Sequence, residues 1–385
     1  ESDVVIAALG ENPTLCGEAR QRKGIRLPGD QERFLKELIA TGKPVVLMMF
    51  GGRPQVIDEV EAGCAAILQA WYPGEEGGNA VADILLGNVN PSGKLCVSYP
   101  KTESEELYCY NNGVSQEKIA YPFGFGLSYT SFSYSELNVP EVYSGGKIQI
   151  RFKIKNIGKV SGAEIAQLYI CPIESDVIRS HIELKEFQKI YLHPREEKEV
   201  ILELDERSFS VYDVEKKAFS MLSGKYQICI GASVHDLQLK ANMEVVGNSY
   251  FRNERELFPD YFREQPHGME ISAEQFYQLL GGEPKHDKEK KRGEYTVYDS
   301  YQDVVNVSMF GKFVRGVVHI GLKIILRGKS ERDPAFKMVK MGVEEGNLEG
   351  LIATSGGIAT PKLIDMLVYN ANKKYLQAFK RLLKK

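Results

Sequence analysis

The chain has 385 residues, of which 43% are hydrophobic and 26% are charged, and its formal net charge is −3. It is long enough for two or three domains with hydrophobic cores of their own. The near-neutral charge excludes a general attraction to nucleic acid, which requires a basic face. No apolar run approaches the roughly 18 residues of a membrane span.

The six cysteines are spread along the sequence without close spacing, which argues against a zinc site and against a disulfide scaffold. We therefore expect no metal and no cofactor. Free cysteines also predict a reducing compartment, and we expect a cytoplasmic protein. The first residues lead directly into an apolar run without a recognisable signal peptide, so we expect the sequence to be a segment of a longer protein.

Alternating strands and helices are predicted for the first hundred residues. Residues 4–9 and 45–50 are continuous apolar runs, typical of parallel strands that are covered on both faces. A third strand is predicted over residues 65–70. Helical patterns over residues 30–40 and about 77–86 complete a βαβαβα unit, which predicts a right-handed parallel sheet. In the first of these helices Asp30 is placed to cap the start and Gly42 to end it.

Three loops leave the carboxyl ends of these strands, over residues 10–22, 51–54 and 71–76. Open α/β sheets bind ligands at that edge, so the chemistry is expected there. Trp71 begins the third loop. We interpret it as core packing at a strand end in preference to an aromatic wall for a sugar.

From about residue 132 the pattern changes to short strands with a period of two, separated by turn signals. This predicts a β-sandwich of roughly 110 residues. Beyond about residue 246 the pattern is helical, with a short helix over 270–280 that Ser272 caps. A charged, exposed linker is expected over 284–292, followed by helices near 309–327 and 361–383.

The stretch 309–327 has a basic face at helical spacing, and its apolar residues lie elsewhere around the helix. A basic amphipathic helix can lie on an anionic membrane surface. We favour a helix that packs on the protein with its basic face in water, and we expect no membrane contact. The basic residues are Lys312, Arg315, His319, Lys323 and Arg327, and the apolar ones are Phe313, Val317, Ile320 and Ile324.

The segment Gly17-Glu18-Ala19-Arg20-Gln21-Arg22, followed by Leu27-Pro28-Gly29-Asp30-Gln31, resembles the acid/base loop of glycoside hydrolase family 3, the retaining β-glucosidases and their relatives. In that family the loop is close to Glu-Gly-x-Asp-Arg and then Leu-Pro-Gly-x-Gln. Glu18 and Arg22 fit this form, whereas Ala19 and Gln21 depart from it. Further stretches resemble family motifs in the family's order, namely 42–54, 70–78, 91–95, 121–130 and 156–169.

The resemblance implies a domain organisation for the whole chain. An N-terminally incomplete α/β sandwich domain, based on a parallel sheet, would occupy residues 1–110, and a connector 111–132. An all-β immunoglobulin- or fibronectin type III-like sandwich would occupy 133–247. A mostly helical extension, similar to those of some bacterial members, would occupy 248–385.

The resemblance also implies a function: the C-terminal part of a retaining exo-β-glycosidase, most simply a β-glucosidase, acting on β-glucosides or oligosaccharides. Glu18 would be the general acid/base. The nucleophile would come from a barrel domain, whose Ser-Asp-Trp-type loop does not occur in this sequence. The chain alone would then be inactive. The barrel domain would determine whether the sugar removed is glucose, xylose, arabinose or galactose. The parent's domain order and homo-oligomerisation are left open.

Glu11 stays open as a competitor for the acid/base role because it lies closer to the strand end. We prefer Glu18 because the spacing of Arg22 and of residues 27–29 fits it. Arg22 would either orient Glu18 or nearby loop groups, or form a salt bridge to Asp30 or another loop carboxylate.

Two other functions compete with the enzymatic one. In the first alternative the chain is a non-catalytic carbohydrate- or protein-binding module whose sandwich holds the partner. A flavodoxin-like nucleotide binder rests on sheet topology alone, and it is disfavoured because no Gly-x-Gly-x-x-Gly follows the first strand.

Overall fold

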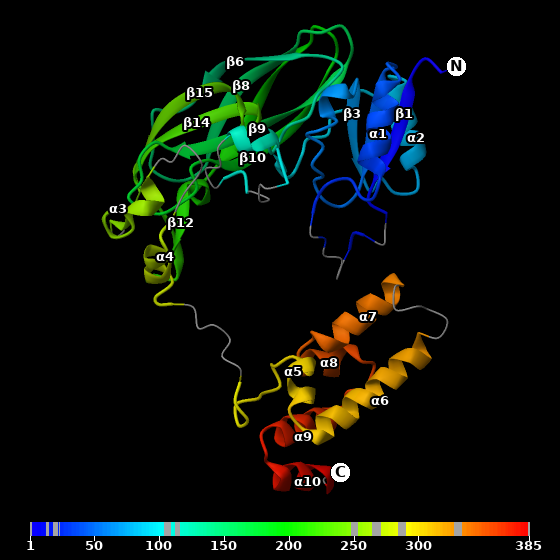
Figure 1. Ribbon diagram of the computed structural model, residues 1–385. Helices are drawn as coiled ribbons and strands as arrows, with labels where there is room; N and C mark the ends of the chain where they lie inside the picture. The colour runs from blue at the N-terminus through cyan, green and yellow to red at the C-terminus, as the bar shows by residue number, and fades with distance from the viewer. Residues whose placement is uncertain are drawn as a thin grey trace. The chain divides into compact units, whose positions relative to one another are not determined.

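A computed structural model describes residues 2–12, 15–17, 22, 24–103, 109–111, 116–247, 253–263, 271–283, 290–326 and 333–383. The chain divides into two compact units, residues 1–11 with 23–282 and residues 12–22 with 283–385. The first unit holds a parallel α/β layer and a β-sandwich, and the second holds helices (Figure 1). The fold class predicted from the sequence is confirmed.

The α/β layer contains a three-stranded parallel sheet in the order β1-β2-β3. Leu35 of the first helix packs on this sheet together with Ala7, Leu47 and Met49, and all four side chains are buried. The elements are β1 (Val5–Gly10), α1 (Gln31–Ala40), β2 (Val45–Phe50), β3 (Ala66–Trp71) and α2 (Gly77–Leu85).

The apolar runs predict strands covered on both faces, and within the described residues this is wrong for one face. Val45, Leu47 and Met49 of β2 are buried, but the residues between them are only half-buried, and Ile6 of β1 is exposed. The physical reason is the strand order. Successive right-handed crossovers in one direction lie on the same face, and Val60, from the β2–β3 connection, joins the α1 core.

The ends of α1 differ in part from the sequence prediction. Asp30 occupies the N-cap position, but its side chain makes no capping hydrogen bond. Its carboxylate instead lies 3.7 Å from Arg33, one turn into the helix. Gly42 follows the last turn with a φ of +75°, the left-handed conformation that commonly ends a helix.

The segment between the two domains of the first unit contains a short hairpin-like pair. β4 (Tyr99–Pro100) pairs antiparallel with β5 (Ile119–Tyr121), so part of the expected connector returns to the α/β side. The domain limits drawn from the sequence, at 110, 132 and 247, stay predictions.

The β-sandwich has a five-stranded sheet, β10-β9-β14-β15-β7, and a three-stranded sheet, β11-β8-β6, with a β12–β13 hairpin beside them. Its core follows from the period-two pattern, because Ile150, Phe152 and Ile154 of β8 all point inward and are at most 1% exposed. The strands are β6 (Phe132–Asn138), β7 (Val142–Tyr143), β8 (Ile148–Asn156), β9 (Gly162–Pro172), β10 (Glu183–Leu192), β11 (Glu197–Leu204), β12 (Ser210–Asp213), β13 (Ala218–Met221), β14 (Gly224–Ser233) and β15 (Asp236–Val245).

Two of the six cysteines, far apart in the sequence, lie together in this sandwich. Cys171 of β9 and Cys229 of β14 are free thiols whose Sγ atoms are 3.9 Å apart. Sequence spacing does not reveal such a pair, because the two strands meet only through the sheet.

After the sandwich, α3 (Glu254–Leu257) and α4 (Ala273–Leu279) are short helices. Ser272 caps α4 as predicted, since its hydroxyl accepts a hydrogen bond from the Gln275 amide. The helix begins at residue 273, three residues later than expected. Within the predicted linker, residues 284–289 lie outside the described residues.

The second unit contains α5 (Tyr301–Asn306), α6 (Met309–Ile325), α7 (Pro334–Glu344), α8 (Leu348–Thr354), α9 (Pro361–Ala371) and α10 (Tyr375–Leu383). Val304, Leu348 and Leu367 are among the fully buried residues of its core. Among the described helices, none has the length and apolarity that a membrane crossing requires.

The helical stretch expected near 361–383 is present as two helices, because the chain breaks between α9 and α10. Asn372 is buried and binds the backbone of a distant loop: its Oδ1 accepts from Gly293 N at 2.9 Å and from Tyr295 N at 3.0 Å. Its Nδ2 donates to Tyr295 O at 2.7 Å. Lys373 then adopts a φ of +58°, which stops the helix. A long-range contact therefore overrides the local helical pattern.

Candidate functional site at the strand ends

The three parallel strands end side by side, so their following loops leave from one edge. Gly10 of β1 pairs in register with Phe50 of β2, and Phe50 pairs with Trp71 of β3. This is the edge at which open α/β sheets bind ligands. The structure thus places the beginnings of the three predicted loops next to one another.

The first loop starts from a tightly held backbone. The Gln31 side chain accepts from Gly10 N at 2.7 Å and donates to Gly10 O at 3.0 Å. Gly10 has a φ of +136°, and a Cβ there would lie 1.8 Å from the Phe50 carbonyl oxygen. Only glycine permits this approach of the two strand ends.

Glu11, the competitor for the acid/base role, is an internal ion-pair residue. Its side chain is fully enclosed, and Oε2 lies 3.1 Å from Arg53 Nε. Gln55, buried at 2% exposure, lies beside it, and its Nε2 has no hydrogen-bond partner among the described residues. A Cβ on Gly51 would be 3.5 Å from both Glu11 Oε2 and Gln55 Nε2, so the three residues share one small space.

Arg26, which follows the first loop in the sequence, lies in an ionic network. Its guanidinium lies 3.2 Å from Glu32 and 2.8 Å from Asp58, and Glu103 also pairs with it at 3.5 Å. Burial alone would lower the pKa of Arg26, but the charges of Glu32 and Asp58 outweigh burial and raise it. The Ile25 amide donates to the same Glu103 carboxylate at 3.1 Å.

Glu18, the predicted acid/base, lies outside the described residues, as do its neighbours 19–21. Gly17 and Arg22 are described, and Arg22 is half-buried. On either side of this segment the structure describes Glu11, which follows β1, and Ile25, whose carbonyl accepts a hydrogen bond from Val56 N at 3.0 Å. The role of Glu18 stays a prediction.

Trp71 lies in an aromatic cluster at the end of β3. Its ring meets Tyr99 edge-to-face at 6.1 Å, and Tyr99 meets Tyr121 at 6.0 Å. The Tyr121 hydroxyl donates to Glu61 at 2.6 Å. Burial raises the pKa of both tyrosines, so both stay neutral near neutral pH. These contacts agree with the packing interpretation of Trp71.

Sequence reasoning missed Gln31, Arg53 and Gln55 as parts of this edge. Their position in the sequence was the one signal for Arg53 and Gln55, because polar residues follow the ends of buried parallel strands there. Their pairing with Gly10 and Glu11 depends on how α1 and the β2 loop fold back. Among the residues that the structure describes, no group of three His, Cys, Asp or Glu is placed to hold a metal ion.

Two parts of the chain match known domain families. Residues 1–129 match the glycosyl hydrolase family 3 C-terminal domain, and residues 164–234 match the fibronectin type III-like domain. The chain carries a glycoside hydrolase family 3 C-terminal domain. The strand-end edge lies inside this family 3 domain, and the fibronectin type III-like match lies inside the β-sandwich. The family resemblance drawn from the motifs is confirmed.

Relatives of the family 3 domain include enzymes from several bacteria. A periplasmic β-glucosidase of Salmonella typhimurium is 34% identical over 252 residues, which are 60% of this chain and 33% of that protein. A β-xylosidase of Formosa agariphila is 34% identical over 248 residues, 60% of this chain and 34% of that protein. A Listeria innocua β-glucosidase crystallised with glucose superposes with a TM-score of 0.60 at 34% identity, covering 64% of this chain and 37% of that one. The chain thus spans about a third of these relatives.

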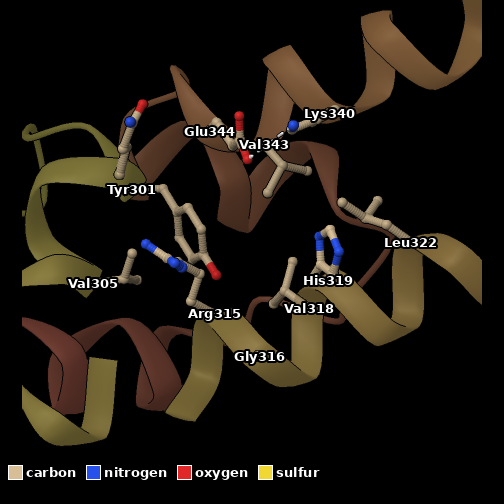
Figure 2. A pocket seen from close by; sticks show the side chains of 11 residues that line it. Tyr301, Val305, Arg315, Gly316, Val318, His319, Leu322, Lys340, Val343 and Glu344 are labelled. Carbon is tan, nitrogen blue, oxygen red and sulfur yellow. Dashed lines mark ion pairs between the residues drawn. The ribbon is translucent and has the colours of Figure 1, made fainter. Parts of the chain in front are cut away.

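A separate cavity of about 400 Å³ lies in the helical unit, outside the matched residues, between α5, α6 and α7. Figure 2 shows the Tyr301 ring extending into it beside the Arg315 side chain. Arg315 donates to Asn306 at 2.6 Å, and Lys340 pairs loosely with Glu344 at 4.0 Å. The Tyr301 hydroxyl is buried without a hydrogen-bond partner in the described part of the chain, and burial raises its pKa to about 12.

Proposed function

We propose that this chain supplies the general acid/base, Glu18, of a retaining β-glycosidase of the β-glucosidase type. The observation that supports the proposal is the place of Glu11, which directly follows β1 at the carboxyl edge of the sheet, inside the part of the chain that matches the family 3 domain. Glu18 comes seven residues later in the sequence, in the stretch that resembles the family's acid/base loop. Relatives that share this domain are named β-glucosidases and a β-xylosidase.

The reaction requires a second carboxylate about 5–5.5 Å from the acid/base, which forms the covalent glycosyl-enzyme. In the proposal that nucleophile comes from a barrel domain outside this sequence. Glu18 first protonates the leaving glycosidic oxygen and then removes a proton from the attacking water. A glutamate with an ordinary pKa of about 4.3 is mostly ionised at neutral pH, so the nucleophile's charge must raise it. Formation of the glycosyl-enzyme removes that charge just when a base is needed.

The surroundings of Glu11 make it a poor candidate for the proton donor. Its carboxylate is enclosed and ion-paired to Arg53, and its own backbone amide is held by the Phe50 carbonyl at 2.8 Å. A general acid must reach the substrate oxygen at hydrogen-bond distance. Glu11 is better suited to hold the start of the loop.

The test uses the chain joined to or co-expressed with a family barrel domain, and hydrolysis of aryl β-glucosides is measured. Glu18→Gln is expected to lower kcat/KM by roughly 10²–10⁴ for a poor phenolate leaving group, the usual scale of acid/base assistance. The loss should shrink for an activated leaving group, which needs little protonation. Azide should restore turnover of the activated substrate in Glu18→Ala, because azide attacks the glycosyl-enzyme without a base.

Glu11→Gln is the matched control. It should lower the free energy of unfolding by about 1–3 kcal/mol, because a half-enclosed Arg53 loses its charged partner, and its activity should depend on the leaving group as in the wild type. Equal losses on all leaving groups in Glu18→Gln would reject the acid role. Full activity of that variant would favour the alternative, a non-catalytic carbohydrate- or protein-binding module.

A further inference from the structure

α6 has two apolar faces, and the described part of the helical unit covers only one of them. Val314 and Leu322 are less than a tenth exposed and pack inward. The expectation of a helix packed on the protein is therefore met for that face. Five other large apolar side chains are more than half exposed: Met309 (90%), Phe313 (68%), Val317 (54%), Ile320 (61%) and Ile324 (68%).

These five residues, here called the α6 stripe, are spaced by four, four, three and four positions along one continuous helix. At about 100° per residue this spacing keeps them on one line, and they extend over roughly 22 Å. An isolated exposed apolar residue needs no explanation, but a contiguous stripe marks an interaction surface. The stripe therefore requires a partner.

The charges beside the α6 stripe indicate the chemistry of that partner. α6 contains no Asp or Glu, and the exposed Lys312 and Lys323 lie along one border of the stripe. The surrounding region has the same sign, since residues 290–385 carry 18 Lys and Arg against 9 Asp and Glu, although the whole chain is at −3. An apolar line with a cationic border complements a surface that has an apolar interior and an anionic outer layer.

We propose that α6 lies flat on an anionic phospholipid bilayer, with the α6 stripe in the interface and Lys312 and Lys323 beside lipid phosphates. The helix has the large apolar arc, cationic border and lack of acidic residues that suit this position. A second copy of the chain fits less well, because a two-fold interface brings the same patch against itself and α6 offers no acidic residue to pair with these lysines.

α10 repeats the pattern on a smaller scale. Leu376, Phe379 and Leu383 are more than half exposed, and the helix carries Lys380 and Arg381 without an acidic residue. Such a helix also has the composition of an interfacial helix.

The test is co-sedimentation of the full chain with vesicles of phosphatidylcholine containing about a third phosphatidylglycerol, and with phosphatidylcholine alone. Binding is expected only to the anionic vesicles. Phe313→Glu with Ile320→Glu should weaken it at least 100-fold. Lys312→Gln with Lys323→Gln should weaken it by about fivefold per lysine, as expected for roughly 1 kcal/mol each.

The matched control is Phe187→Glu with Val214→Glu, which changes the charge equally at apolar residues of the sandwich that are 60% and 75% exposed. This control should bind like the wild type. Circular dichroism verifies that both double variants fold. The proposal is overturned if the wild type ignores anionic vesicles, or if the stripe variant binds as well as the control. A stripe variant that instead changes the oligomeric state, or lowers the melting temperature, would show that polypeptide covers α6.

Discussion

In the β-sandwich, Ile150, Phe152 and Ile154 of β8 recur at the strand period, and the facing sheet covers all three. In α6, Phe313, Ile320 and Ile324 recur at the helix period, and each is more than 60% exposed. The two patterns are equally regular. The difference shows that periodic apolar residues predict a face that must be covered, but not what covers it. Where the chain itself provides no cover, the pattern carries information about a partner.

The largest expected effect is the difference in the free energy of unfolding between alanine substitutions of two phenylalanines. Phe152→Ala should lower the free energy of unfolding by about 3–5 kcal/mol, because it leaves a cavity in the sandwich core. Phe313→Ala should change it by no more than about 0.5 kcal/mol, because its ring is already in water. Urea denaturation of the full chain measures both. A large loss in Phe313→Ala would break the comparison, since it would mean that another part of the chain buries α6.

Two buried asparagines offer the next comparison. Asn156 donates to Val160 O and Leu192 O in the sandwich, as Asn372 donates to Tyr295 O in the helical unit. Replacing either by alanine should cost about 2–4 kcal/mol, because buried backbone groups lose their partners. In calorimetry each substitution should lower the transition of its own unit, while the exposed Asn242→Ala leaves both unchanged. A common shift of one transition would show that the two units unfold together.

Two buried tyrosines should respond in opposite directions to removal of the hydroxyl. Tyr226 donates to Leu222 O at 3.1 Å and accepts from Arg179 at 3.0 Å, so Tyr226→Phe should cost about 1–2 kcal/mol. The Tyr301 hydroxyl is buried without a partner in the described residues, so Tyr301→Phe should be neutral or stabilising by up to about 1 kcal/mol. The melting temperatures of the two variants, compared with that of the wild type, would show whether the changes have opposite signs. A clear destabilisation by Tyr301→Phe would reveal a partner for this hydroxyl, such as a bound molecule in the cavity.

The smallest expected effect is a difference in pH dependence. Burial works to raise the pKa of Asp299, but Lys290 and the Thr296 amide outweigh it and lower the pKa. Its contribution is present above the unfolded pKa of about 3.9 and is lost as the pH falls through the depressed value. Burial raises the pKa of Glu164 despite Lys94 at 3.0 Å. Its contribution is therefore full below about 4.3 and is lost as the pH rises through the raised value.

Melting temperatures between about pH 3 and pH 6 should show the two signs. The helical unit should lose stability toward low pH, and Asp299→Asn should flatten that loss. Glu164→Gln should remove the opposite slope from the sandwich transition. Parallel pH profiles for the two transitions would contradict this assignment.

The sequence predicted the strand ends and loops of the candidate site, but not the side-chain contacts within it. Parallel strand ends and their loops were predictable because buried runs and helical stripes alternate along the first hundred residues. The pairing of Glu11 with Arg53 was not, since the two residues are brought together only when adjacent strands align. That alignment weakens Glu11 as the acid and leaves Glu18 as the residue to test.

By itself the sequence determined the order of the elements, the family resemblance and the faces of strands and helices, because these depend on local periodicity and contiguous motifs. Only the tertiary structure decided which face is covered. It left Ile6 exposed because the crossovers share one side of the sheet, and it ended α9 because Asn372 binds a loop 77 residues away. It also exposed the α6 stripe. Each of these outcomes depends on contacts between residues distant in the chain, which no local pattern encodes.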